Sequence, residues 1–147
     1  MNTNQKTAAM EAMKVKFSTL WIFAMFNYLY CDVLALFDPV TQKSITAGSA
    51  GGLQFSQGFL LGSAVLMEIP IAAVLLSRVL KYRANRWANI IAGTIMTAIQ
   101  FLSLFAGTPP TLYYIFFSAI EIACTLLIVW FAWKWRNPES EVPSIAG

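Results

Sequence analysis

Five polar side chains lie inside long apolar stretches of the sequence, where water is not available to solvate them. They are the acids Asp32, Glu68 and Glu121 and the amides Asn27 and Gln100. A charged acid at the middle of a membrane helix costs about 2.5–3.5 kcal/mol, and such residues usually face a protein interior and carry function. No lysine or arginine lies near the middle of these stretches, so we expect at least one glutamate to hold or share a proton. This pattern predicts a site for protons, cations or small ligands.

The residue types present argue against other kinds of site. The sequence contains no histidine, which is the commonest metal ligand and the usual general base. Cys31 and Cys124 both fall inside apolar stretches, and we interpret them as small buried hydrophobic residues. No nucleophile or metal-ligand motif is present. We therefore expect no catalytic residues, no metal, no cofactor and no enzyme activity.

The elements that must position these residues are membrane-spanning helices. Of the 147 residues, 58% are hydrophobic and 12% are charged, whereas soluble domains carry about 25% charged residues. A hydrocarbon core of about 30 Å needs roughly 20 apolar residues in helical form. Four stretches meet this length: 17–37, 58–80, 87–106 and 111–133. The sequence therefore predicts an all-α transmembrane four-helix bundle, connected up-down-up-down, over residues 17–135.

Residues outside the spans are predicted to be tails and one longer loop. Residues 1–16 and 136–147 are polar and are expected to be cytoplasmic tails. In the loop 38–57, Asp38 is a suitable cap for a short helix that starts at Pro39 and ends at Gly48. The N-terminal segment is open to two interpretations, an amphipathic surface helix or a frayed end.

The basic residues predict which way the helices cross the membrane. Of the 10 lysines and arginines, all but Lys43 lie in the N-terminal tail, around the 81–86 connection or at the C-terminal end, from Lys134 onward. The positive-inside rule then places both termini in the cytoplasm. The charges flank apolar stretches and form no basic face, so the net charge of +3 is not interpreted as a nucleic-acid site.

This orientation places the polar residues at two depths. Asn27, Glu68 and Glu121 are predicted to lie about 15 Å below the outer surface, near the midplane. Asp32 and Gln100 are predicted to lie about 8–9 Å deep, so that the five residues form a funnel that opens outward. On the last span, one face collects Ser118, Glu121, Thr125 and Ile128.

The second span carries two further features. Pro70 has no N–H and leaves the carbonyl of Leu66 without its helical donor, which predicts a kink beside Glu68. Gly58 and Gly62 are four residues apart and offer a face for close helix packing, either within the chain or between copies in a homo-oligomer.

Several segments resemble a family of small, uncharacterised bacterial four-span membrane proteins that is defined by a domain of unknown function. In this sequence the segments are 18–23, 27–33, Asp38-Pro39, 67–70 and 83–89. The resemblance covers residues 17–135 and implies a multi-pass protein of the inner (cytoplasmic) membrane. It implies no activity.

Two functional hypotheses remain open. In the first, the protein binds a proton, a cation or a small amphipathic ligand at a midplane site of Glu68, Glu121 and Asn27, as a proton-coupled carrier does. In the second, it is a structural or assembly partner whose buried acids only lock helix packing. The expected partners are the lipid bilayer, an unidentified ion or ligand and further copies of the chain.

Overall fold

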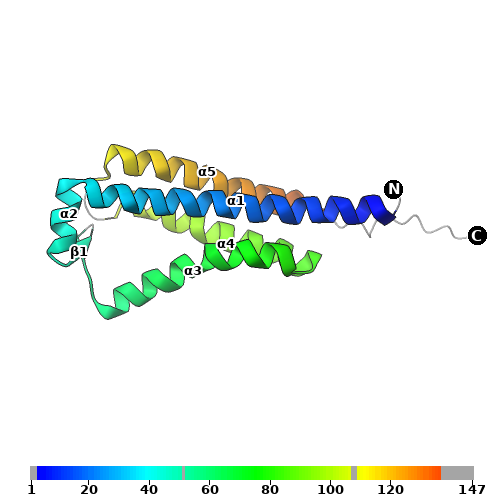
Figure 1. Cartoon of the computed structure of the whole chain (residues 1–147), viewed down its shortest axis with the longest axis horizontal. Coiled ribbons are helices and arrows are strands. Elements are labelled where there is room, and N and C mark those ends of the chain that lie inside the picture. Colours follow the sequence, from blue (N-terminus) through cyan, green and yellow to red (C-terminus); the bar gives the residue numbers. More distant parts are fainter. Residues whose placement is uncertain (1–2, 51, 107–108, 137–147) are drawn as a thin grey trace, which may run out of the picture.

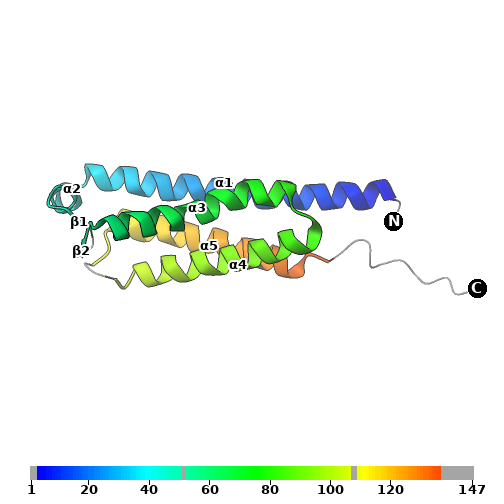
Figure 2. The same ribbon diagram turned by 90° about the horizontal axis from the view of Figure 1, so that it is seen from below.

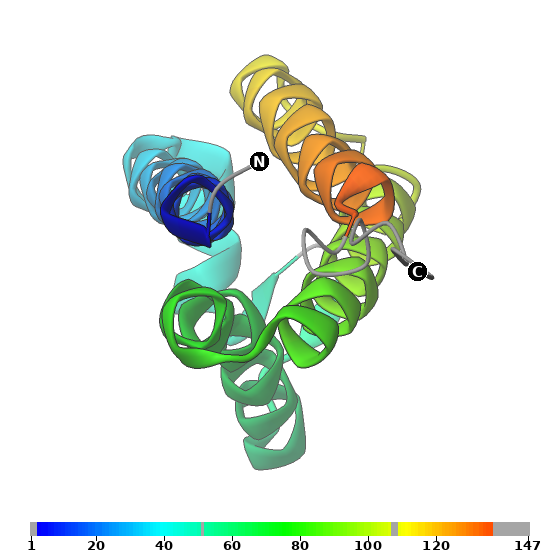
Figure 3. The ribbon, with the colours of Figure 1, turned by 90° about the vertical axis from the view of Figure 1, so that its right-hand side faces the viewer.

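The computed structural model describes residues 3–50, 52–106 and 109–136. Four long helices lie alongside one another (Figure 1). They are α1 (Thr3–Phe37), α3 (Gln57–Val79), α4 (Tyr82–Ser103) and α5 (Leu112–Lys134). Successive long helices run in opposite directions, as Figure 2 shows. α1 contacts α3 and α5, and α4 contacts the same two helices, so the four form a ring when viewed end-on (Figure 3). The predicted all-α bundle is confirmed.

The outside of the bundle is more apolar than the surface of a water-soluble protein. The helices α1, α3 and α5 are long and apolar enough to cross a membrane. Among the described residues, many large apolar side chains are exposed on the outside, and a hydrophobic core that includes Phe17, Trp21 and Met96 is buried inside. Polar side chains are buried with this core: Ser18, Asn27, Ser77, Asn85, Asn89, Ser118, Glu121 and Thr125. An exterior rich in leucine, isoleucine and phenylalanine fits lipid better than water. Membrane proteins usually turn their polar side chains toward the interior of the bundle, as this chain does.

The first helix is longer than the predicted span. α1 begins at Thr3 and runs without interruption through 35 residues, so the segment 3–16 is helical and continuous with the span. No glycine or proline lies between Thr3 and Phe37 to end it. Lys14 and Glu11 form an ion pair of 2.9 Å on this extension. Of the predicted C-terminal tail 136–147, all except Arg136 lies outside the described residues.

The connection between α1 and α3 contains the predicted short helix, α2 (Pro39–Thr46). The hydroxyl and the backbone N–H of Thr41 both donate to the Asp38 carboxylate, and they hold the pKa of that carboxyl below its ordinary value. The helix ends before Gly48, which has a φ of 81° that side-chain-bearing residues rarely adopt. The short strands β1 (Ser49–Ala50) and β2 (Leu53–Gln54) then pair antiparallel. The predicted cap and the predicted helix end are both confirmed.

The end of the bundle that holds the α3–α4 connection is fastened by hydrogen bonds to the last turn of α5. Arg86 donates from Nε to the carbonyl of Ala132 at 3.0 Å and from Nη2 to that of Trp133 at 3.1 Å. The Tyr82 hydroxyl donates to the carbonyl of Trp135 at 2.7 Å. These carbonyls have no partner within the helix, and a cation suits the negative end of the helix dipole.

Candidate functional site

Glu121 is the centre of the candidate site. α5 buries one face that contains the predicted set Ser118, Glu121, Thr125 and Ile128. The Glu121 side chain is 1% exposed, and its Oε1 atom has no hydrogen-bond partner among the described residues. An unpaired buried polar atom costs about 1–3 kcal/mol, and a charged one costs more. This position therefore favours a carboxyl group that carries a proton or binds a positive ligand.

A second unpaired polar group comes from the facing helix. Tyr28 on α1 is 7% exposed, and its hydroxyl is buried with no partner in the described part of the chain. Glu121 lies near enough to interact electrostatically with Tyr28, Cys31 and Asp32. Asp32 lies one helical turn after Tyr28, and its side chain is exposed. The four groups therefore share one region between α1 and α5, with Asp32 at its open edge.

Contacts on both sides of α5 hold Glu121 in place. On the α1 side, the Cys124 thiol donates to the carbonyl of Leu20 at 3.3 Å. On the α4 side, Thr97 donates to the Thr125 hydroxyl at 2.7 Å, and Thr125 in turn donates to the Glu121 carbonyl at 2.9 Å. The helix that carries Glu121 is thus fastened to α1 and to α4 within one turn of the carboxyl group.

Close packing of α4 against α5 depends on Gly93. A Cβ atom at this position would lie 2.7 Å from Cγ2 of Val129 and 3.3 Å from the carbonyl oxygen of Thr125. The absence of a side chain lets the two backbones approach closely, which is what small residues achieve in membrane helix packing. The hydrogen bond between Thr97 and Thr125, one turn away on α4, depends on this approach.

The structure separates the five predicted site residues into three groups: Glu121 with Asp32, the two amides Asn27 and Gln100, and Glu68 alone. Glu121 and Asp32 share the region between α1 and α5. Asn27 is buried on α1 and donates to its own helix at the Phe23 carbonyl, 2.8 Å away, while Gln100 donates to the Ser118 hydroxyl at 2.8 Å. Both amides are thus already bonded within the protein.

Glu68 departs from the expectation that it faces the bundle interior. Its side chain is exposed on α3, and it makes no hydrogen bond to any described residue. The buried residues of α3 are Pro70, Ala73 and Ser77, all in its second half. The first half points away from the other helices (Figure 1), so a residue at the centre of α3 is not enclosed. The neighbouring acid of Glu121 is Asp32, not Glu68.

A buried polar cluster was missed by sequence reasoning. The side-chain oxygen of Asn89 accepts from Trp21 Nε1 at 2.7 Å and from the Ser77 hydroxyl at 3.2 Å. The Asn89 amide nitrogen donates to Asn85 Oδ1 at 2.6 Å, and Asn85 donates to the Ser77 carbonyl at 2.6 Å. The cluster joins α1, α3 and α4. The four-residue spacing of Asn85 and Asn89 was the signal in the sequence, since it places both amides on one helix face.

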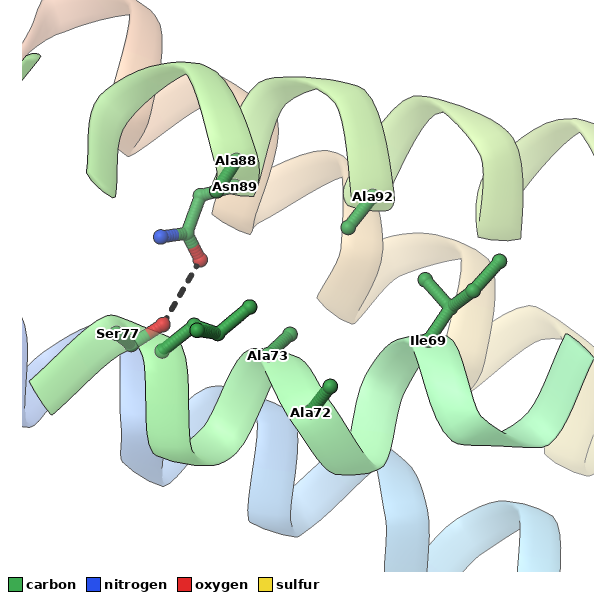
Figure 4. A pocket seen from close by; sticks show the side chains of 8 residues that line it. Ile69, Ala72, Ala73, Ser77, Ala88, Asn89 and Ala92 are labelled. Carbon is green, nitrogen blue, oxygen red and sulfur yellow. Dashed lines mark hydrogen bonds between the residues drawn. The ribbon is translucent and has the colours of Figure 1, made fainter. Parts of the chain in front are cut away.

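A pocket of about 240 Å³ lies beside this cluster, between α3 and α4 (Figure 4). Small or apolar side chains form most of its wall: Ile69, Ala72, Ala73, Leu76, Ala88 and Ala92. Its polar members, Ser77 and Asn89, are bonded to each other at 3.2 Å. The wall of the pocket is therefore mostly hydrocarbon, and the polar groups of Ser77 and Asn89 are already bonded. The region around Glu121 differs, because polar groups there are unpaired.

The described residues contain no group of three or more His, Cys, Asp or Glu side chains placed to hold a metal ion. Cys31 and Cys124 are both free and buried. The chemistry available at Glu121 is therefore that of a carboxyl group, a phenol and a second carboxyl group at the rim. Such oxygen groups exchange protons and bind hard cations.

An all-α bundle with three candidate spans, an apolar exterior and polar side chains buried in its core defines a multi-pass integral membrane protein. Residues 8–141 match a family described as a family of unknown function (DUF6326), and the chain belongs to this family. Comparison with curated proteins and with solved structures found no match.

Proposed function

We propose that the protein is a four-span protein of the cytoplasmic membrane that binds an exchangeable proton or a small cation at Glu121, and that it couples this binding to the handling of a small ligand. The observation that carries the proposal is the unpaired Oε1 atom of a glutamate that is 1% exposed. The neighbouring Tyr28 hydroxyl, which is also unpaired, supports it.

The outer face of α4 supports its assignment as the fourth span. The helix turns Asn85, Asn89, Gly93 and Met96 inward. Its outward side chains are apolar and exposed: Trp87, Ile91, Ile95, Phe101 and Leu102. Asn85 and Asn89 lower its mean hydropathy, but both are bonded inside the bundle. The face that is left for lipid is mainly apolar, with Thr94 as its exposed polar residue at mid-helix. The basic residues near both termini and around 81–86 favour a cytoplasmic location for that end.

The groups around Glu121 have distinct expected roles. The Glu121 carboxyl holds the proton or the cation. The Tyr28 hydroxyl and Glu121 Oε1 are both unpaired, and a local shift of either side chain would let the hydroxyl donate to the ionised carboxylate and stabilise its charge during exchange. Asp32 lies at the exposed rim, where its negative charge attracts an incoming cation. Cys31 and Cys124 contribute apolar bulk that limits access of water.

Proton release on cation binding tests this proposal. Purified protein in weakly buffered detergent would receive Na⁺, and a pH-sensitive dye would report released protons. We expect a release approaching one proton per chain, no release from Glu121→Gln, and normal release from the matched control Glu68→Gln. For Tyr28→Phe we expect cation affinity to fall roughly tenfold, which corresponds to about 1.4 kcal/mol. Undiminished release from Glu121→Gln would contradict the assignment.

The second candidate function is that of a structural or assembly partner in the membrane. It is favoured by the exposed, unbonded Glu68 on a helix that is poorly enclosed. In that case Glu121→Gln, which keeps a hydrogen-bonding group, would leave cellular function intact, whereas Glu121→Leu would abolish it.

A further inference from the structure

The first half of α3 is an apolar helix that the rest of the chain covers only in part: Leu66 and Met67 pack against the core, while the opposite side is exposed. The most apolar 18-residue stretches of α3 and α5 have the same mean hydropathy, 2.2. In α3, 11% of this stretch is buried, whereas in α5 the buried share is 33%. Pro70 lies inside α3, and the helix changes direction about midway (Figures 1 and 3). Proline removes one backbone hydrogen bond and commonly kinks a helix at this point. The segment before Pro70 therefore projects sideways from the bundle.

One stripe of this segment has the spacing of a helix–helix seam. Gly58, Leu61, Val65 and Glu68 follow one another at intervals of three, four and three residues. All four are exposed, and Leu61 is 67% exposed. Apolar residues at alternating intervals of three and four form the contact line between two parallel helices that cross at a small angle. Nothing in the described chain packs against this line.

Contact between lipid and the seam is unfavourable at Glu68. The residue lies at the midpoint of α3, so a span that is centred in the membrane places its carboxyl group near the midplane. No described residue of the same chain hydrogen-bonds it. A polar group in this position needs a polar partner, because hydrocarbon offers none.

A second copy of the chain supplies the partner with the right chemistry at the right depth. Two copies inserted with the same topology are related by a two-fold axis along the membrane normal, so each seam residue meets its own equivalent. A protonated carboxyl group is both a donor and an acceptor, and it is therefore complementary to an identical group that shares the proton. We propose that two copies pack along Gly58, Leu61, Val65 and Glu68 of α3, with their Glu68 carboxyl groups hydrogen-bonded to each other.

Disulfide cross-linking in native membranes tests this interface. In full-length protein with Cys31→Ala and Cys124→Ala, Leu61→Cys lies on the seam, and Leu60→Cys is its control. Leu60 is at nearly the same depth and is 47% exposed, but it points about 100° away around the helix. Mild oxidation should convert most of the Leu61→Cys protein to a species of doubled mass, because seam residues lie within disulfide reach. The Leu60→Cys protein should stay monomeric.

The role of the carboxyl pair is tested in the Leu61→Cys protein. Glu68→Gln should keep the cross-linked dimer, because an amide also donates and accepts, whereas Glu68→Leu should lose most of it. Equal yields from Leu60→Cys and Leu61→Cys, or no dimer from either, would overturn the proposal. A cross-linked product whose mass is not twice that of the chain would show that a different protein packs on the seam, and this result would also overturn the proposal. A dimer that persists in Glu68→Leu would show that the Glu68 carboxyl groups do not hold the two copies together, and would overturn that part of the proposal.

Discussion

Replacing Asn89 with leucine should lower the free energy of unfolding more than any other single change in the polar interior. The substitution keeps the branching of the side chain but removes the acceptor for Trp21 and Ser77 and the donor to Asn85. Interhelical hydrogen bonds in membranes average about 0.6 kcal/mol, and each buried group left unpaired adds to the loss, so we expect a total of about 2–3 kcal/mol. Equilibrium unfolding in mixed detergent micelles, followed by circular dichroism, measures this.

The control for Asn89→Leu is Ser77→Ala. It removes a single bond of 3.2 Å and leaves the Asn89 oxygen paired with Trp21. We expect it to cost about 0.6 kcal/mol. If the two variants lost equal stability, the cluster would not be the connection among α1, α3 and α4 that its geometry indicates.

Substituting alanine for Gly93 should separate α4 from α5. The added methyl group would meet Val129 at 2.7 Å and the Thr125 carbonyl at 3.3 Å, and backbone atoms cannot rotate aside as a side chain can. Overpacking of this kind costs about 1–3 kcal/mol. The hydrogen bond between Thr97 and Thr125 would lengthen, and the unfolding midpoint in the same micelle assay would fall.

Gly62 provides a matched comparison on another helix. No atom lies within 4 Å of a Cβ built there, so Gly62→Ala meets no steric resistance within the chain. Alanine is favoured over glycine inside a helix by roughly 0.5–1 kcal/mol, and we expect a neutral or stabilising effect. A loss of stability at Gly62 as large as that at Gly93 would contradict the packing described for α4 and α5.

Much of the fold could be predicted from local physical signals. Long apolar stretches defined the helices, and α3 and α5 begin and end within one residue of the predicted spans 58–80 and 111–133. Asp38, Pro39 and Gly48 correctly bounded α2, because cap and turn preferences act over a few residues. For residues 1–16 a helix and a frayed tail were both left open, and the structure has a helix that is continuous with the first span, since nothing in the segment breaks it.

The candidate site was less predictable, because it depends on how each helix is rotated and tilted. The face of α5 that carries Glu121 could be read from residue spacing, and it is buried as expected. Glu68 has an equally polar side chain, but the divergence of the first half of α3 leaves it outside. Pro70 predicted a kink at this place, but the sequence does not predict the direction in which the helix diverges. Tyr28 was passed over, because a tyrosine in an apolar stretch gives no signal until its hydroxyl is seen to lack a partner.

Infrared titration of the purified protein tests the central claim most directly, since a protonated carboxyl group has its own C=O stretching band. Wild type would be compared with Glu121→Gln and with the control Glu68→Gln. We expect a carboxyl band that disappears reversibly as the pH is raised, is absent from Glu121→Gln and is retained in Glu68→Gln. A band assigned to Glu121 that stays unchanged at every pH, in a variant that loses only stability, would show that Glu121 is a structural hydrogen-bonding group and would contradict the proposed site.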